Sequence, residues 1–531
     1  MSYKKLIDEN PFKESKTLGS PKIGGNACVY GACSIEDFPS GISDLRYTHE
    51  DASGFLDYPT SFTPANFWRK DSGVQAWMYE EPYDNWQDLY GMDAVVVFYH
   101  SGHGTMNDSN GVFSAPMGSA WGGKTWARSS SMVIDEKLRY LFWSTCLSLR
   151  VHDGHTPCRT WRGPNKGGLR MIFGYETTSV DSKKYGSNFW NQWKKGKSFS
   201  AAFLEASWSI SKKQTPVVAA FGSNVQESRS RLNDERFFYN QAVGNNVCSY
   251  MWRESSSSRG LKAAKLVVPQ NPEVLLLGSS LVEDDLLSKI ANKIGVTKRT
   301  SQIISVGQDG MRKIGTKNVA LYLDPSGTLQ LQMAKANYRN GSQISESKAT
   351  DIARGLIDDL GIAKGIKLSQ SVTYNTFMGD ANVKTGSQSD AKVVETIVQF
   401  RQVNDKMESL NADSGFVSVA VDNDGKITNV ISSLKPIVDV QKPMKVKVPS
   451  KEKSLSLDEQ LDAKVERLKR EVAGSGALKL GADAPQVSVK TISDEIGYDF
   501  SSNYAKPVQQ RDVEIKVGDY AKRYVLSVDL E

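Results

Sequence analysis

Short runs of hydrophobic residues in the first half of the chain indicate strands that are buried on both faces. Three of them lie at residues 94–99 (AVVVFY), 138–145 (LRYLFWST) and 169–175 (LRMIFGY), and residues 26–35 (NACVYGACSI) contain a fourth. Continuous apolar runs of this kind are typical of central parallel strands. Helical patterns alternate with them at residues 47–58, 187–195 and 198–211. The pattern therefore predicts α/β architecture, a three-layer sandwich around a mostly parallel sheet.

The pattern changes beyond a polar, low-complexity segment at residues 254–260 (ESSSSRG). Residues 318–331 and 415–430 alternate around Asp-Pro-Ser-Gly and Asp-Gly turns, which predicts two hairpins. A helix is expected at residues 345–360, with Gly361 as its C-cap, and a charged helix at residues 456–473. The second half is therefore expected to be an α+β region, in which the order helix, strand, hairpin occurs twice.

These patterns divide the chain into five parts. We expect an N-terminal arm at residues 1–25, an α/β domain at 26–253 and a linker with a connecting segment at 254–317. A first α+β module then spans residues 318–445, and a second, smaller one spans 446–531. A chain of 531 residues is too long for one hydrophobic core, so a division into several units agrees with its length.

The distribution of reactive residues separates the two halves. All five His, all eleven Trp and all five Cys lie before residue 253. An odd, low number of cysteines in a long chain argues against a disulfide framework and is compatible with a free thiol. The second half has no Cys and no His. We therefore expect a catalytic half joined to a non-catalytic one.

A histidine and a cysteine follow two of the predicted strands. Residues 94–99 run into His100, Ser101, Gly102, His103 and Gly104, and residues 138–145 run into Cys146. The carboxyl ends of neighbouring parallel strands face one crevice, so an imidazole and a thiol far apart in sequence are expected side by side. An imidazole next to a thiol removes its proton and later protonates a leaving amine.

Each residue at these two strand ends has an expected role in the site. Cys146 is the expected nucleophile and His103 its acid/base partner, while His100 is expected to pack or to orient its neighbour. The backbone N–H groups of Gly104 and Cys146 are candidate donors to an oxyanion. Glycine at position 104 would let a substrate carbonyl approach the main chain closely.

These two strand ends, AVVVFYHSGHG and LRYLFWSTC, resemble the caspase-like (clan CD) cysteine peptidases, and within them an uncharacterised prokaryotic caspase-like family. The resemblance covers roughly residues 26–250. It implies a caspase-like fold and hydrolysis of peptide bonds by a Cys-His dyad. The residues around Cys146 lack the Gln and Arg-Gly that flank the nucleophile of caspases proper, so specificity for Asp is not implied.

Asp153, Glu176 and Asp181 lie on segments that are expected to reach the crevice. An acidic pocket there would select Arg or Lys at P1 through charge-assisted hydrogen bonds. Basic P1 residues are also what this branch of the family commonly accepts. The alternative for each carboxylate taken singly is a solvated loop residue.

The second half resembles PepSY-type or propeptide-type modules over short stretches, mainly the helix at 345–360 and the run VSVAVDNDGKITNV. In several secreted peptidases such modules chaperone or inhibit the catalytic domain. We therefore expect the C-terminal region to dock on the peptidase cleft or to bind a partner.

Two alternatives remain open at this point. His152, His155 and Cys158 are spaced at three residues, and with His100 and His103 they would offer zinc ligands for a metal-dependent hydrolase. The second alternative is a non-catalytic protein with the same fold, which would have an interaction or structural role. The main expectation has no cofactor and no metal.

The expected partner is a protein or peptide substrate. A net charge of +6 over this length is a mild excess and indicates neither nucleic acid nor an anionic membrane. No apolar run spans a membrane and no signal peptide is visible at the N-terminus, so a cytoplasmic location is expected, with a trimmed secreted form as the alternative. The P1 residue, the activation trigger and the oligomeric state are left open.

Overall fold

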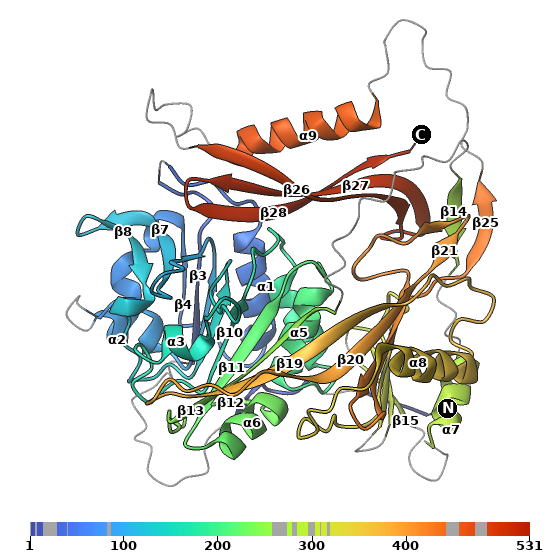
Figure 1. Cartoon of the computed structure of the whole chain (residues 1–531), viewed down its shortest axis with the longest axis horizontal. Coiled ribbons are helices and arrows are strands. Elements are labelled where there is room, and N and C mark those ends of the chain that lie inside the picture. The colour runs from blue at the N-terminus through green and yellow to red at the C-terminus, as the bar shows by residue number, and fades with distance from the viewer. Residues whose placement is uncertain are drawn as a thin grey trace, which may run out of the picture.

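The computed structural model describes residues 2–5, 8–13, 29–39, 41–81, 86–256, 273–278, 284–295, 303–307, 309–315, 319–441, 456–472 and 486–530. A large mixed sheet crosses the molecule with helices on both sides, and a smaller sheet lies above one end of it, under a long helix (Figure 1).

The large sheet contains sixteen strands within the described residues. In spatial order they are β1 (Ser2–Lys5), β15 (Ile303–Val306), β16 (Arg312–Gly315), β17 (Ala320–Leu323), β18 (Leu329–Gln332), β24 (Ile427–Ser432), β23 (Phe416–Asp422), β20 (Lys392–Arg401), β19 (Val372–Asn382), β13 (Val247–Ser255), β11 (Pro216–Gly222), β10 (Met171–Tyr175), β9 (Tyr140–Ser144), β5 (Val97–Ser101), β3 (Tyr30–Ser34) and β4 (Phe67–Lys70).

The prediction of a mostly parallel sheet is correct for one block and wrong for the sheet as a whole. Strands β4, β3, β5, β9 and β10 pair in parallel. From β10 through β11, β13 and β19 to β15, every pair is antiparallel. In the second half, consecutive strands such as β17 and β18 or β23 and β24 are joined by short turns, which connect antiparallel neighbours. Strands β10, β11 and β13 of the first half also pair antiparallel, although helices lie between them in the chain.

Helices cover one face of the parallel block, as expected. They are α1 (Thr48–Thr60), α4 (Tyr185–Trp193) and α5 (Phe199–Trp208), followed by α6 (Val225–Asp234) on β11 and β13. Phe55 of α1 and Phe189 of α4 pack against Phe142 of β9, whose ring stacks on Phe173 of β10 at 4.0 Å. This aromatic layer fixes the strands whose ends carry the candidate site.

Short elements cover the opposite face, in place of long helices. They are η1 (Asp71–Gly73), η2 (Ala76–Met78), α2 (Trp86–Tyr90), η3 (Met92–Ala94), η4 (Ser129–Ser131) and α3 (Pro157–Trp161), with a three-stranded sheet of β6 (Thr105–Met106), β7 (Phe113–Trp121) and β8 (Lys124–Arg128). Trp143 and Trp161 are fully buried there. The core therefore has two halves, one on each side of the block.

The second half repeats one arrangement, a helix followed by an antiparallel run of strands. Helix α7 (Asp284–Lys293) precedes β15–β18, and α8 (Glu346–Leu360) precedes β19, β20, β23 and β24. The sequence prediction of both hairpins and of α8 is confirmed. The Ser345 side chain accepts from the Lys348 N–H, and Gly361 adopts the left-handed C-cap conformation with φ of 68°.

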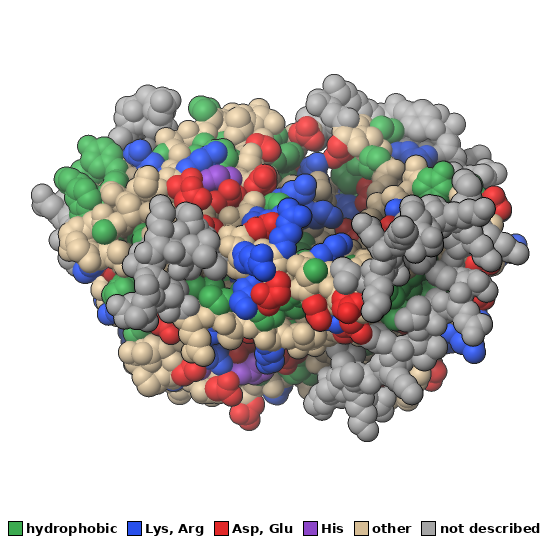
Figure 2. Space-filling view, turned by 90° about the horizontal axis from the view of Figure 1, so that it is seen from above, with side chains coloured by type: hydrophobic (Ala, Val, Ile, Leu, Met, Phe, Trp, Pro, Cys, Tyr) green, Lys and Arg blue, Asp and Glu red, His purple; other side chains and the backbone are tan. Residues whose placement is uncertain are grey.

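The C-terminal part forms a separate, smaller sheet beneath α9 (Leu457–Val472). Its strands are β26 (Val487–Asp499), β27 (Tyr504–Val517) and β28 (Tyr520–Asp529), joined by β14 (Val274–Leu277) and β25 (Ile437–Gln441). Val465 and Leu468 of α9 pack on Val513 and Ile515 of β27. The outward face of this unit carries many charged side chains (Figure 2).

The expected domain boundaries do not coincide with gaps in the sheets. Strand β13 crosses the boundary at residue 253 and pairs with β19 of the second half over nine residues. The expected linker contributes β14, α7, β15 and β16. The expected arm also contributes strands: β1 pairs with β15, and β2 (Phe12–Lys13) pairs with β12 (Phe238–Tyr239). A last short pair joins β21 (Val403–Asn404) to β22 (Met407–Glu408).

Among the described residues, no helix is both long and apolar enough to cross a membrane.

Candidate active site

The candidate site lies where β5 and β9 end side by side. The two strands are parallel neighbours, and Ser101, the last residue of β5, pairs with Ser144, the last residue of β9. His103 and Cys146 each lie two residues beyond this pair. The register thus brings the imidazole and the thiol to the same edge of the sheet, which is the placement that the sequence pattern predicts.

Gly104 packs directly against the backbone that carries the thiol. A Cβ atom at this position would lie 2.6 Å from the carbonyl oxygen of Cys146 and 2.7 Å from the ring of Phe113. The residue after the thiol, Leu147, has a left-handed φ of 56°, which is uncommon for a branched side chain. Close backbone approach and a sharp turn therefore fix the position of the sulfur.

The His103 imidazole is held by one nitrogen. Its Nε2 lies 2.9 Å from the carbonyl oxygen of Ser43 and 2.9 Å from the hydroxyl of the same residue. Donation from Nε2 to the carbonyl leaves the lone pair on Nδ1, which is buried and has no hydrogen-bond partner among the described residues. Burial lowers the pKa of His103 to about 3, and the Lys522 ammonium contributes to that decrease. The ring is therefore neutral at pH 7 in this buried state.

His100 belongs to the core, in keeping with the expectation that it packs. Its side chain lies on the face of β5 opposite α1, where Nδ1 is 2.7 Å from the Tyr79 hydroxyl and its ring contacts Trp143 at 5.0 Å. Burial lowers its pKa to about 3 as well. It is fully buried and has no access to a substrate.

The Cys146 sulfur has polar neighbours. Its Sγ accepts from the backbone N–H of Ser179 at 3.3 Å and lies 3.5 Å from the hydroxyl of that residue. The thiol donates to the carbonyl oxygen of Ala521 at 3.2 Å. The residue is 1% exposed. Because two of these atoms come from the segment at residue 179 and one from β28, the sulfur lies at an interface between two parts of the chain.

Strand β28 covers the site. The Nζ of Lys522 lies 3.1 Å from the Ser179 hydroxyl and 3.5 Å from the carbonyl oxygen of Gly102. The Tyr520 ring contacts the His103 ring at 5.8 Å. Four consecutive residues of the C-terminal unit, 520–523, thus lie across both candidate catalytic side chains.

The same strand also pairs with the segment that follows β10. Arg523 donates from its N–H to the Ser179 carbonyl at 3.1 Å, and its own carbonyl accepts from the Asp181 N–H at 2.9 Å. Residues 179–181 therefore extend the free edge of β28 by one short strand.

Asp181 lies next to this contact. One of its carboxylate oxygens accepts from the Arg46 N–H at 2.9 Å. Burial raises the pKa of its carboxyl group, and the positive charges of Lys522 and Arg46 partly offset that increase. Of the three carboxylates expected in the pocket, Asp181 is the one that interacts electrostatically with Lys522, whose side chain occupies the site.

Asp153 and Glu176 have a different neighbour. Both bind Arg150, with Asp153 at 2.8 Å and Glu176 at 3.2 Å. Glu176 also accepts from the Val151 N–H. Glu176 is buried and Asp153 exposed. Their contacts anchor the loop after Cys146.

The residues considered as zinc ligands do not converge. His152 binds Glu254 at 2.9 Å, His155 lies 3.8 Å from Asp108, and the Cys158 sulfur lies 4.0 Å from the Asn382 carbonyl oxygen. Within the described part of the chain, the group of ligand-type side chains that meets closely is Asp88, Asp93 and Asp135. Asp93 is already bound by four backbone N–H groups.

Ser43, Ser179 and Lys522 are site residues that the sequence analysis missed. Ser179 lies within the expected α/β domain, four residues after the strand predicted at residues 169–175. Ser43 and Lys522 carry no local signal, because their positions depend on contacts between segments 60 and 343 residues apart.

Residues 32–255 match a family described as a domain of unknown function (DUF6345). The matched stretch runs from β3 to the end of β13 and contains both Cys146 and His103. No curated protein matches the chain.

Proposed function

We propose that this chain is a caspase-like cysteine peptidase, in which Cys146 is the nucleophile and His103 the acid/base. The observation that carries the proposal is the register of β5 and β9. Their last residues, Ser101 and Ser144, are paired, and His103 and Cys146 each follow two residues later. The Ser43 carbonyl supports it, since it orients the imidazole and leaves Nδ1 with a lone pair.

The proposed reaction has two halves. His103 takes the thiol proton, and the sulfur of Cys146 attacks the carbonyl carbon of the scissile peptide. The imidazolium returns the proton to the leaving amine, and a thioester remains on Cys146. His103 then deprotonates a water molecule, which attacks the thioester and releases the carboxylic acid, and the proton goes back to the sulfur. Backbone N–H groups of Gly104 and Cys146 are the proposed oxyanion donors.

The C-terminal unit is proposed to regulate this activity by occupying the site. Residues 520–523 bury the thiol, and Lys213 fixes the unit by ion pairs with Asp512 and Glu495, both at 2.7 Å. The backbone carbonyl of Lys213 also accepts from the Arg523 guanidinium at 2.6 Å. A substrate reaches Cys146 after these contacts open, so the described structure is the closed form.

The closed site also suggests a substrate class. It holds a lysine, Lys522, against Ser179, Gly102 and the negative charge of Asp181. A peptide with Lys or Arg at P1 would make the same contacts, since both side chains offer cationic donors. We therefore propose cleavage after basic residues.

The test uses Arg523→Pro in the full chain. Both backbone groups of Arg523 face residues 179–181, so the substitution removes the docking N–H, together with the guanidinium that binds the Lys213 carbonyl, and leaves the ladder between β27 and β28 in place. Val525→Pro, two residues further along the same edge, is the matched control.

Fluorogenic peptides ending in Arg, Lys, Asp or Asn are incubated with both variants and with Arg523→Pro combined with Cys146→Ala or Cys158→Ala. The proposal expects cleavage of Arg and Lys peptides by Arg523→Pro, loss of that cleavage with Cys146→Ala, and retention with Cys158→Ala. Cleavage that persists in Cys146→Ala contradicts the mechanism.

A non-catalytic caspase-fold protein is the second candidate, and the burial of both side chains favours it. His103 is fully buried and Cys146 is 1% exposed. In that case Arg523→Pro exposes the thiol to alkylation without producing peptide cleavage.

A further inference from the structure

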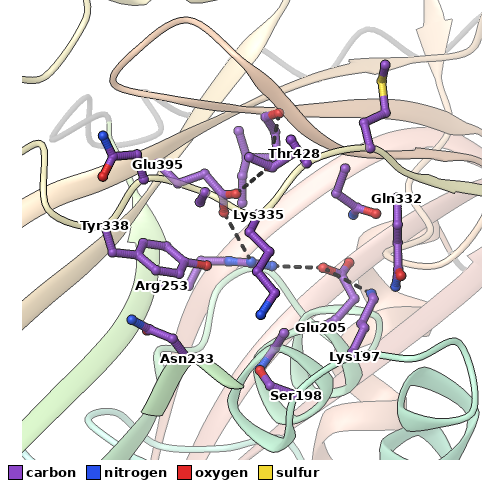
Figure 3. A pocket seen from close by; sticks show the side chains of 18 of the residues that line it. Lys197, Ser198, Glu205, Asn233, Arg253, Gln332, Lys335, Tyr338, Glu395 and Thr428 are labelled. Carbon is purple, nitrogen blue, oxygen red and sulfur yellow. Dashed lines mark hydrogen bonds and ion pairs between the residues drawn. The ribbon is translucent and has the colours of Figure 1, made fainter. Parts of the chain in front are cut away.

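A large cavity lies over the antiparallel part of the large sheet, next to α5. Its volume is about 1050 Å³, and it is bounded by α5 and α6 on one side, by β20, β23 and β24 on the other, and by the loop at residues 333–339 (Figure 3). Ligand pockets in proteins are commonly of this size.

The cavity is built from regular faces of its elements. Ala201, Glu205 and Trp208 form one stripe of α5, spaced by four and three residues. Strand β23 contributes alternate residues, Phe416, Ser418 and Ala420. The intervening residues of β23 point to the other side of the sheet and pack under α8. The cavity therefore lies on one face of the sheet, and the opposite face packs against α8 in a hydrophobic core.

Ionic groups form the floor of the cavity. Arg253 lies between two carboxylates, with Glu205 at 2.9 Å and Glu395 at 3.7 Å (Figure 3). Lys197 lies 4.0 Å from Glu205, and Lys212 donates to the Ala412 carbonyl at 2.6 Å with its ammonium over the Phe416 ring. Three basic side chains thus face two carboxylates on the floor of the cavity.

The two lysines have few compensating contacts among the described residues. Lys197 is 8% exposed and donates to the Gln192 side chain at 2.6 Å. Burial lowers the pKa of each lysine to about 7, with the nearby Lys195 and Arg401 adding to the effect at Lys197 and Lys212 respectively. An ammonium group has three donors, and a buried one is stabilised by an anion.

Two acceptors that line the cavity lack donors. The side-chain oxygens of Gln399 and Asn233 are buried and have no hydrogen-bond partner among the described residues. Buried polar atoms normally have partners, and a ligand hydroxyl or amide N–H would supply them. The required ligand therefore combines a negative charge with hydrogen-bond donors.

We propose that this cavity binds a small organic anion that carries hydroxyl or amide donors, such as a sugar acid or a hydroxy acid. Its acidic group would lie near Lys197, Lys212 and Arg253, and its donors would reach Gln399 and Asn233. This site is separate from the Cys146 site and does not depend on peptidase activity.

The test is isothermal titration of the full-length protein with D-glucuronate, citrate and N-acetylglutamate. Glucose, which has hydroxyls without charge, and propionate, which has charge without donors, are the matched probes. Saturable binding of at least one of the three anions, stronger than that of glucose and propionate, is expected. Absence of binding by all three overturns the proposal, and so does equal binding of propionate.

The residues are tested with Lys212→Met and Gln399→Leu, each checked for folding by thermal melting. Both are expected to weaken binding by about tenfold, since each loses one charged or buried polar contact. Lys364→Met, on the exposed surface, is the control and should leave the affinity unchanged. If a folded Lys212→Met and a folded Gln399→Leu both bind as tightly as wild type, the assigned cavity is wrong.

Discussion

The thiol of Cys146 donates a hydrogen bond to the backbone carbonyl of Ala521, 375 residues further along the chain. The contact joins the candidate nucleophile to β28 of the C-terminal unit. Around it, Tyr520 covers His103 and Lys522 reaches Ser179 and Gly102. The closed site is therefore shared by two parts of the chain, and its reactivity depends on whether they separate.

The shielding of Cys146 predicts slow alkylation. Iodoacetamide should react with Cys146 much more slowly in wild type than in Arg523→Pro, because the latter lacks the N–H that docks β28 on Ser179. Peptide mass spectrometry over time measures the rates. Val525→Pro should behave as wild type, and an equal rate in all three proteins would argue against β28 as the cover.

The ion pairs of Lys213 predict a second way to loosen the unit. Lys213→Met leaves Asp512, which is largely buried, without its cation. We expect a loss of about 2 kcal/mol in unfolding free energy and faster hydrogen exchange in β28.

The control for this substitution is Lys184→Met, which breaks an exposed pair with Asp413. It should cost less than about 0.5 kcal/mol. Similar effects of both substitutions would show that Lys213 does not hold the unit.

Gly104 predicts a steric effect at the site. In Gly104→Ala the new methyl group would meet the Cys146 carbonyl at 2.6 Å, so the backbone must shift at a cost of about 1–3 kcal/mol. Denaturant titration measures it. Gly163→Ala is the matched control, because a Cβ at position 163 has no neighbour within 4 Å. A Gly104→Ala protein as stable as Gly163→Ala would contradict the close approach.

The low pKa of His103 predicts a pH dependence of stability. Its folded-state pKa of about 3 lies below the ordinary value of 6.5, so between these values the unfolded chain binds more protons. Stability therefore falls as the pH drops from 6.5 towards 3. His103→Gln should reduce this slope by up to about 1.4 kcal/mol per pH unit.

His152→Gln is the contrasting variant, because the hydrogen bond with Glu254 raises the pKa of His152. His152 adds stability below pH 6.5, and that contribution is lost as the pH rises through its folded-state pKa. Its removal should therefore leave a steeper fall in stability towards acid pH. Urea titrations at pH 5 and pH 7 compare the two variants, and identical slopes would contradict the assigned shifts.

The sequence predicts the local features of this molecule well. Apolar runs locate β5, β9 and β10, and capping residues locate α8, because each of these signals is contained in a few neighbouring residues. The positions of His103 and Cys146 follow from the same runs, since both residues come directly after a strand.

Pairing between distant strands has no local signal. The bond between β13 and β19, which makes one sheet of two expected domains, joins residues more than 100 positions apart. The run at residues 523–530 (RYVLSVDL) is typical of a strand, yet nothing in it indicates that Lys522, the residue just before it, reaches Gly102. The site residues that were missed are those fixed by such long-range contacts.

The most direct test of the account is covalent labelling of the opened full-length protein with a peptidyl acyloxymethyl ketone that carries Lys at P1. Intact-mass and peptide mapping of Arg523→Pro should show one adduct per chain, located on Cys146, and the adduct should be lost in Arg523→Pro combined with His103→Gln. An adduct on another cysteine, or labelling of Cys146 that does not depend on His103, would contradict the proposed dyad.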